Sequence, residues 1–114
     1  MPYLKLQTNK PLDPQAVPTI MHALSKGVSA ALGKSENYIM IALESGKPML
    51  FAGNDGPTAF VELKSLGLPE DQTARFSETL CGLIEQETGI SKERIYIEFA
   101  GPARHMWGWN GTTF

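Results

Sequence analysis

The sequence predicts an α+β fold that contains two similar β-α-β units. The chain has 114 residues, and its strand patterns repeat at half that length. Tyr3–Thr8 aligns with Phe60–Ser65, and Tyr38–Ala42 aligns with Ile95–Phe99. The first pair alternates apolar and polar residues, and all four segments are rich in the aliphatic and aromatic residues that strands favour.

A helical pattern of apolar residues separates the two strands of each unit. The first pattern spans Val17–Leu32 and the second spans Phe76–Ile84, with apolar residues mostly three or four positions apart. Gly33 and Gly89 follow these segments, where glycine can take the left-handed conformation that ends a helix. A strand, a helix and a strand in this order predict parallel strands joined by a right-handed crossover.

Two such units side by side predict a four-stranded mixed sheet with both helices on one face. We expect a single domain over residues 1–114, with pseudo-repeats at about 2–57 and 59–114. Short extra strands are expected at Met49–Ala52 and at Met106–Trp109, where subunits would meet. The uncovered face of the sheet is expected to carry apolar groups, which favours a closed homo-oligomer.

Composition argues against several classes of partner and site. The net charge of -2 and the pI of about 5.6 disfavour nucleic acid and anionic membranes, because both require a basic surface. No segment resembles a membrane span or a signal peptide. We therefore expect a cytoplasmic protein, with export by another route left open. Cys81 is the only cysteine, and His22 and His105 lie far apart, so no disulfide or metal site is predicted.

The second residue is the strongest candidate for chemistry. Pro2 follows Met1, and a small second residue generally allows the initiator methionine to be removed. The new terminus would be a secondary amine. An α-amine has a pKa of about 7.7–8.0, and burial lowers it further, so a neutral amine could act as a general base or an imine-forming nucleophile. The alternative is that Pro2 marks methionine removal only.

The two units carry unequal polar residues. Tyr96 and Glu98 share one face of a strand, yet at the repeat spacing they align with Ile39 and Ile41. Tyr96 also fits a packed interface tyrosine, and Glu98 also fits a solvated charge. Lys34 follows the first helix, where it either binds a ligand or interacts favourably with the helix C-terminus.

Taken in order, these features resemble the macrophage migration inhibitory factor family of the tautomerase superfamily. The resemblance extends over the whole chain, and it depends on many motifs at nearly fixed spacing. The motifs are Met1-Pro2, Thr8-Asn9, Gly33-Lys34, Tyr38-Ile39, Ser65-Leu66-Gly67, Leu80-Cys81-Gly82-Leu83, Arg94-Ile95-Tyr96-Ile97, Gly108-Trp109-Asn110 and Thr113-Phe114.

The resemblance implies a homotrimer whose sheets enclose a channel, with active sites between neighbouring subunits. It implies keto–enol tautomerisation of phenylpyruvate-like or dopachrome-like compounds without a cofactor. By position, Pro2 would be the general base, and Lys34 would bind the substrate carboxylate with the backbone N–H of Leu66. Tyr96 of the adjacent subunit would lie near the amine. The matching aromatic pocket positions are Tyr38, Trp109 and Phe114.

Three places depart from the family pattern. Glu98 replaces an asparagine that contacts the substrate in vertebrate members, and a carboxylate there would favour the protonated amine. Trp107 replaces a small aliphatic residue at the pocket mouth and would narrow access. Thr58–Val61 replaces a Cys-x-x-Cys motif linked to thiol–disulfide exchange, an activity that is not expected here.

The sequence therefore favours a keto–enol tautomerase that uses Pro2 and acts on a small aromatic keto or enol acid. The alternative is a cytokine-like signalling or binding protein, with an unidentified receptor, in which tautomerase activity is vestigial. A further alternative is a small α+β oligomer that binds an unknown ligand.

Overall fold

A computed structural model describes all 114 residues, and its elements follow the predicted order. The first unit consists of β1 (Tyr3–Thr8), α1 (Val17–Leu32) and β2 (Met40–Glu44), and the second of β3 (Ala59–Lys64), α2 (Thr73–Thr88) and β4 (Ile95–Ala100). The short 3-10 turns are η1 (Glu36–Tyr38), η2 (Glu70–Gln72), η3 (Lys92–Arg94) and η4 (Arg104–Met106). A hairpin of β5 (Gly108–Trp109) and β6 (Thr112–Thr113) ends the chain.

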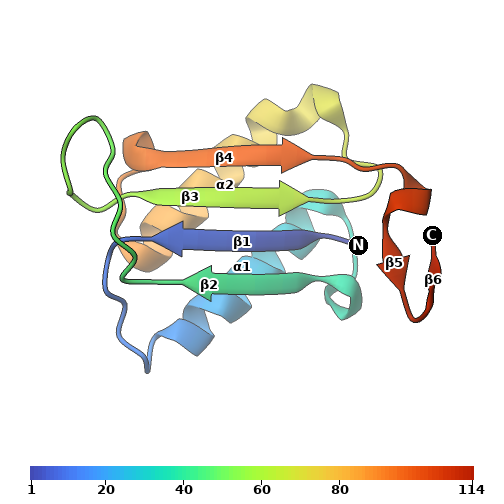
Figure 1. The fold of residues 1–114 in the computed structure, drawn as a ribbon, viewed down its shortest axis with the longest axis horizontal. Coiled ribbons are helices and arrows are strands. Elements are labelled where there is room, and N and C mark those ends of the chain that lie inside the picture. The colour runs from blue at the N-terminus through green and yellow to red at the C-terminus, as the bar shows by residue number, and fades with distance from the viewer.

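The four long strands form one mixed sheet in the order β2-β1-β3-β4. The central strands β1 and β3 are antiparallel, and each outer strand runs parallel to its neighbour. Both helices lie on the same face of the sheet (Figure 1). The predicted four-stranded mixed sheet with two helices on one face is therefore confirmed. No helix has both the length and the apolar character needed to cross a membrane.

The hydrophobic core lies between the sheet and the helices. Strand alternation places Leu4 and Leu6 of β1 and Val61 and Leu63 of β3 on this side, where each is at most 1% exposed. The helices cover them with Ile20, Leu24, Val28, Leu80 and Ile84. Burial of these side chains is the main force that holds the two layers together.

The repeat has a different spacing in its two parts, which corrects one prediction. The buried positions of β1 and β3 match at the predicted spacing. The helices and the outer strands of the two units match at a spacing that is one residue shorter. The expected equivalences of Glu98 with Ile41 and of Tyr96 with Ile39 are therefore wrong. Ile41 packs against the core, whereas Glu98 is exposed on the opposite face. The strand-to-helix connection is one residue shorter in the second unit when the strands are aligned by burial.

The open face of the sheet is charged at its centre, and the expected apolar groups lie toward its two ends, where Met40 is 65% and Tyr96 61% exposed. Lys5 pairs across the strands with Glu62, and Glu62 pairs with Glu98. Lys5 also forms an ion pair with Glu44, with Nζ and Oε1 3.3 Å apart. The cause is the alternation itself, because most aliphatic strand residues face the helices.

One of the two predicted short strands is absent. Met49–Ala52 forms no strand, and only an isolated bridge joins Phe51 to Asn54. The second prediction is confirmed in part, since β5 covers the last two residues of Met106–Trp109 and pairs with β6. Asn110 and Gly111 form the turn between β5 and β6, both with positive φ (51° and 81°), as hairpin turns of this kind require.

Candidate active site

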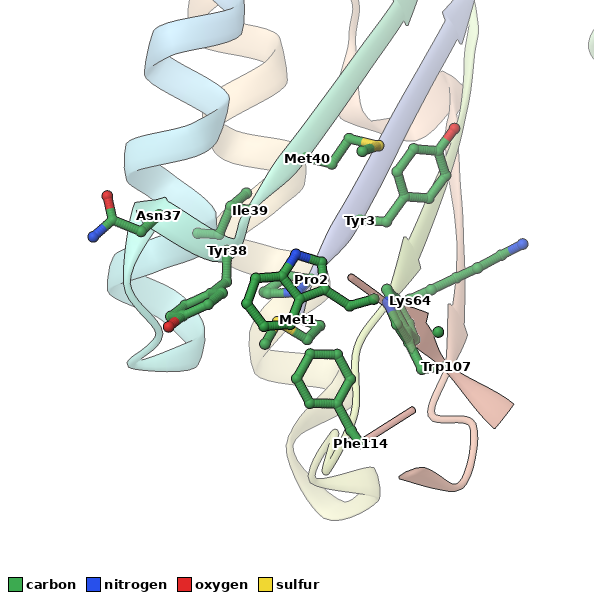
Figure 2. A pocket seen from close by; sticks show the side chains of 12 residues that line it. Met1, Pro2, Tyr3, Asn37, Tyr38, Ile39, Met40, Lys64, Trp107 and Phe114 are labelled. Carbon is green, nitrogen blue, oxygen red and sulfur yellow. The ribbon is translucent and has the colours of Figure 1, made fainter. Parts of the chain in front are cut away.

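A cavity of about 430 Å³ lies where β1 begins and β3 ends. Its walls come from both ends of the chain, from η1 and from the terminal hairpin. Figure 2 shows Pro2 at this cavity beside Tyr38, Trp107 and Phe114. Of the residues predicted for the site, this cavity brings together Pro2, Tyr38, Trp107, Trp109 and Phe114.

Pro2 is held in place by the sheet. It is fully buried, and its carbonyl oxygen accepts a hydrogen bond of 3.0 Å from the N–H of Met40 at the start of β2. This bond extends the parallel pairing of β1 and β2 by one residue toward the terminus. While Met1 is attached, the nitrogen of Pro2 is part of an amide and has no basic lone pair. The fold therefore fixes the proline nitrogen before any methionine removal.

Aromatic rings line one wall of the cavity. The rings of Trp109 and Phe114 are stacked, with centroids 5.8 Å apart and an interplanar angle of 10°. Tyr38 meets Trp109 edge-on at 6.2 Å. The backbone N–H of Phe114 donates to the carbonyl of Trp107 at 3.3 Å, which ties the last residue to the hairpin. This wall is suited to a flat apolar group of about one ring.

Lys34 lies near the start of the chain because helix α1 ends directly before it in the sequence. Gly33 takes the left-handed conformation (φ 65°), and the N–H of Lys34 donates to the carbonyl of Ser29 at 3.2 Å. The Nζ of Lys34 then donates to the carbonyl of Leu66 at 2.7 Å. Lys34 and Leu66 line a second cavity of about 340 Å³. Met1 and Phe114 line both cavities, so these two residues lie at the boundary between them.

The electrostatic environment disfavours positive charge at the chain terminus. The pKa of the Met1 α-amine lies below its ordinary value of 8.0. Partial burial is the larger cause, and repulsion from the Lys34 ammonium group is the next. Both effects act on the position next to Pro2, so they would also favour the neutral form of a proline amine formed there.

Tyr96 and Glu98 do not reach this cavity within one chain. Tyr96 pairs with Phe60 near the start of β3, whereas the cavity lies at the end of that strand. Its side chain is 61% exposed on the open face, where it packs edge-on against Phe51. Glu98 is also exposed on this face and forms no ion pair. A single chain thus brings the predicted base and cation close together, but not these two residues.

Sequence reasoning missed two cations at these cavities. Lys64 lines the aromatic cavity, and Arg104 lines the cavity that contains Lys34. Lys64 is placed by the antiparallel register that sets it opposite Tyr3, which requires knowledge of the strand order. Arg104 belongs to η4, a single turn without any periodic pattern. No group of three or more His, Cys, Asp or Glu side chains is arranged to hold a metal ion.

Comparison with known families gives one match that covers the chain. Residues 1–114 match the family model described as macrophage migration inhibitory factor (MIF). A macrophage migration inhibitory factor homolog of Wuchereria bancrofti is 36% identical over 116 residues, covering 100% of this chain and 99% of the relative. The macrophage migration inhibitory factor of Mus musculus is 33% identical with the same coverage.

Solved structures with this fold agree with that match. A macrophage migration inhibitory factor homologue from Prochlorococcus marinus superposes with a TM-score of 0.91 at 42% identity, covering 98% of each chain. The macrophage migration inhibitory factor of Trichinella spiralis gives a TM-score of 0.90 at 30% identity, covering 98% of this chain and 99% of the other.

Proposed function

The chain belongs to the macrophage migration inhibitory factor family, and we propose that it is a cofactor-independent keto–enol tautomerase. Members of this family are known for tautomerase-type isomerase and cytokine-like roles. The proposed substrates are phenylpyruvate-like or dopachrome-like compounds. One observation supports this most strongly: Pro2 is fixed at a cavity with an aromatic wall on one side and Lys34 close by.

The proposed base is the secondary amine that removal of Met1 would create at Pro2. Burial and the Lys34 charge lower the pKa of an amine at this terminus, which favours the neutral form that a general base needs. In the ketonisation direction, the neutral amine of Pro2 accepts the proton of the enol hydroxyl, and the prolinium so formed delivers a proton to the adjacent carbon. In the reverse direction, the neutral amine removes the proton from carbon. No electrons are transferred, and no cofactor is needed.

Binding uses the two neighbouring cavities. Lys34 would pair with the substrate carboxylate, assisted by the backbone N–H of Leu66. The substrate ring would lie against Tyr38, Trp109 and Phe114, with Trp107 at the opening. Because the two cavities meet at Met1, excision of this residue would free the space next to Pro2 that a substrate must occupy.

We further propose that the active unit is a homotrimer in which a neighbouring subunit completes each site. Tyr96 is largely exposed and lies away from its own chain's cavity, so it is available to a neighbour. Glu98 lies two residues further along the same open strand face. In this assembly, both residues would face the substrate at the cavity of the adjacent chain.

The test is enol–keto conversion of phenylpyruvate, measured after mass spectrometry has confirmed that Met1 is absent. We expect Pro2→Gly to lower kcat/KM by at least about 100-fold, the usual contribution of a general base. Pro11→Gly is the matched control, because Pro11 is exposed and outside the cavity. Size-exclusion chromatography must show the same oligomer for both variants. Equal turnover by Pro2→Gly and the unmodified protein would rule out the proposed base and leave the cytokine-like alternative.

A further inference from the structure

A second cation lines the cavity that contains Lys34. This cavity of about 340 Å³ is bounded by Met1, Leu66, Gly67 and Phe114, with Lys34 and Arg104 as its charged side chains. No acidic side chain lines it, and the terminal carboxylate of Phe114 forms no ion pair with either cation. The two cations come from distant parts of the chain, one just after α1 and the other from η4. The fold therefore brings two positive charges to one small space.

Neither charge is neutralised by the protein. Arg104 forms no ion pair, and none of its five guanidinium N–H groups has a protein hydrogen-bond partner. Lys34 uses one of its three donors on the carbonyl of Leu66 and also has no acidic partner. Two unpaired cations at one cavity favour the binding of an anion, because an anion would relieve their repulsion and accept hydrogen bonds from them.

Arg94 shows what a purely structural arginine looks like in the same chain. Its Nε donates to the carbonyl of Pro57 at 2.9 Å, and its Nη2 lies within 3.4 Å of the carbonyls of Phe51, Asn54 and Gly56. Arg94 therefore has its donors satisfied by a loop. Arg104 has no such partners, and its free guanidinium fits the planar, bidentate recognition of a carboxylate.

We infer that Arg104 acts together with Lys34 to hold the anionic head group of the substrate, and that it selects substrates with an acid group beside the keto carbon. The inference rests on the proposed function, since it concerns the substrate of that same site. It adds a specificity-determining residue in η4, outside the motifs that identified the site from sequence.

The α-amine of Met1 shares this cavity. While Met1 is present, its α-amine lies near Lys34, and the pKa of this amine is lowered first by burial and then by the Lys34 charge. Removal of Met1 takes this group away and leaves room for an anion. The same cleavage that would create the base would therefore also open the site for the head group.

The experiment compares two substrates that differ in one charge: phenylpyruvate and its neutral methyl ester. We expect Arg104→Gln to raise KM for phenylpyruvate about tenfold, the effect of losing one charge-assisted contact, with little change in kcat. KM for the ester is expected to stay within about twofold, and Arg104→Lys is expected to restore only part of the affinity for the acid, because lysine keeps the charge but not the planar fork. Lys92→Gln is the matched control, because it removes an exposed positive charge near the opposite end of the sheet.

Two results would overturn the inference. One is an unchanged KM for the acid in Arg104→Gln, and the other is an equal loss for acid and ester, which would indicate a general structural defect. Binding measured by the fluorescence of Trp107 and Trp109 separates this inference from the proposed function. If the unmodified protein binds the acid but shows no turnover, the proposed function fails, while loss of acid-selective binding in Arg104→Gln still supports the head-group site.

Discussion

The two ends of the sheet are filled in opposite ways. At the end where β1 begins, Pro2 lies beside a cavity of about 430 Å³, and aromatic side chains stand around it. At the end where β4 begins, Arg94 fills the space between the sheet and the loop before β3, with hydrogen bonds to that loop. Its guanidinium carbon lies 5.0 Å from the centre of the Phe51 ring, which packs against Tyr96.

This difference shows how one chain can hold half of a site at each end. We call the end with Pro2 and its cavity the hollow end, and the end with Arg94 and Phe51 the packed end. The hollow end has the proposed base, the cations and the apolar wall. The packed end holds Tyr96 in a defined position on an exposed surface. In the proposed trimer, the packed end of one subunit would meet the hollow end of the next. Both ends are then needed for activity. Changes at the hollow end should lower catalysis, whereas changes at the packed end should lower stability first.

The largest effect is expected at the hollow end. Inserting Ala between Met1 and Pro2 should lower kcat/KM for phenylpyruvate tautomerisation by at least about 100-fold. The reason is that the proline nitrogen stays in an amide whether or not Met1 is removed. Thermal stability and oligomeric state should remain close to those of the unmodified protein. Full activity with an intact, mass-verified insertion would contradict a role for the amine.

Mixing two inactive variants tests whether the two ends cooperate between subunits. Pro2→Gly keeps a normal packed end, and Tyr96→Ala keeps a normal hollow end. If sites are shared, co-refolded mixtures in equal amounts should recover about a quarter of the normal activity, since that fraction of sites receives both intact residues. A mixture that stays as inactive as its components, despite exchange of subunits shown by native mass spectrometry, would argue against shared sites.

Breaking the packed end should lower stability first. Arg94→Ala removes hydrogen bonds to several loop carbonyls and the contact with Phe51, and we expect a loss of about 2–3 kcal/mol of unfolding free energy. Thermal and urea unfolding measure this. Lys92→Ala is the control, because its side chain lies in the same turn but makes no such contacts. Equal stabilities for the two variants would show that Arg94 does not organise this end.

The pH dependence of kcat/KM should follow the charge at the hollow end. A base must be neutral to accept a proton, so activity in the direction that removes a proton from carbon should rise with pH through the amine pKa. That pKa is expected to lie below the ordinary value of a proline amine, in the direction of the shift at Met1. Lys34→Gln removes a repulsive charge and should move the rise to higher pH, apart from its effect on binding. A pH profile that does not move would show that Lys34 has no influence on the base.

The smallest effect is expected between the two ends, on the open face. The pKa of Glu44 is lowered, first by its hydrogen bond to Lys5, so its contribution to stability is present above its ordinary value of 4.5. This contribution is lost as the pH falls through the lowered pKa. Because the pair is exposed, Glu44→Gln should reduce the melting temperature by no more than a few degrees near pH 7. The difference should vanish in acid, and a constant difference at all pH values would contradict this origin.

The fold was largely predictable because its layers depend on periodic burial. Helix lengths, helix ends and the mixed sheet follow from apolar spacing and from the two glycines, Gly33 and Gly89. It was harder to predict which residues of β2 and β4 are equivalent. A connection that is one residue shorter in the second unit changes these equivalences without disturbing the spacing of apolar residues. The Met49–Ala52 prediction failed because an apolar run forms a strand only where a partner strand is available.

The site was predictable only where a motif or a chain terminus marked it. Pro2, Lys34 and the aromatic C-terminus carry such marks, and the structure places them at two adjoining cavities. Lys64 depends on the antiparallel register of β1 and β3, and Arg104 depends on how the chain returns after β4. These are long-range features of topology, so local sequence patterns could not reveal them.

Both chain termini lie at the same end of the sheet (Figure 1). Met1 and Phe114 line both of the adjoining cavities described there. An affinity tag or fluorescent protein fused to either end would therefore sit at the proposed site and impair it, even if the fold were unaffected. Preparations for activity or receptor assays need native ends, and tags should be cleaved so that Pro2 becomes the first residue.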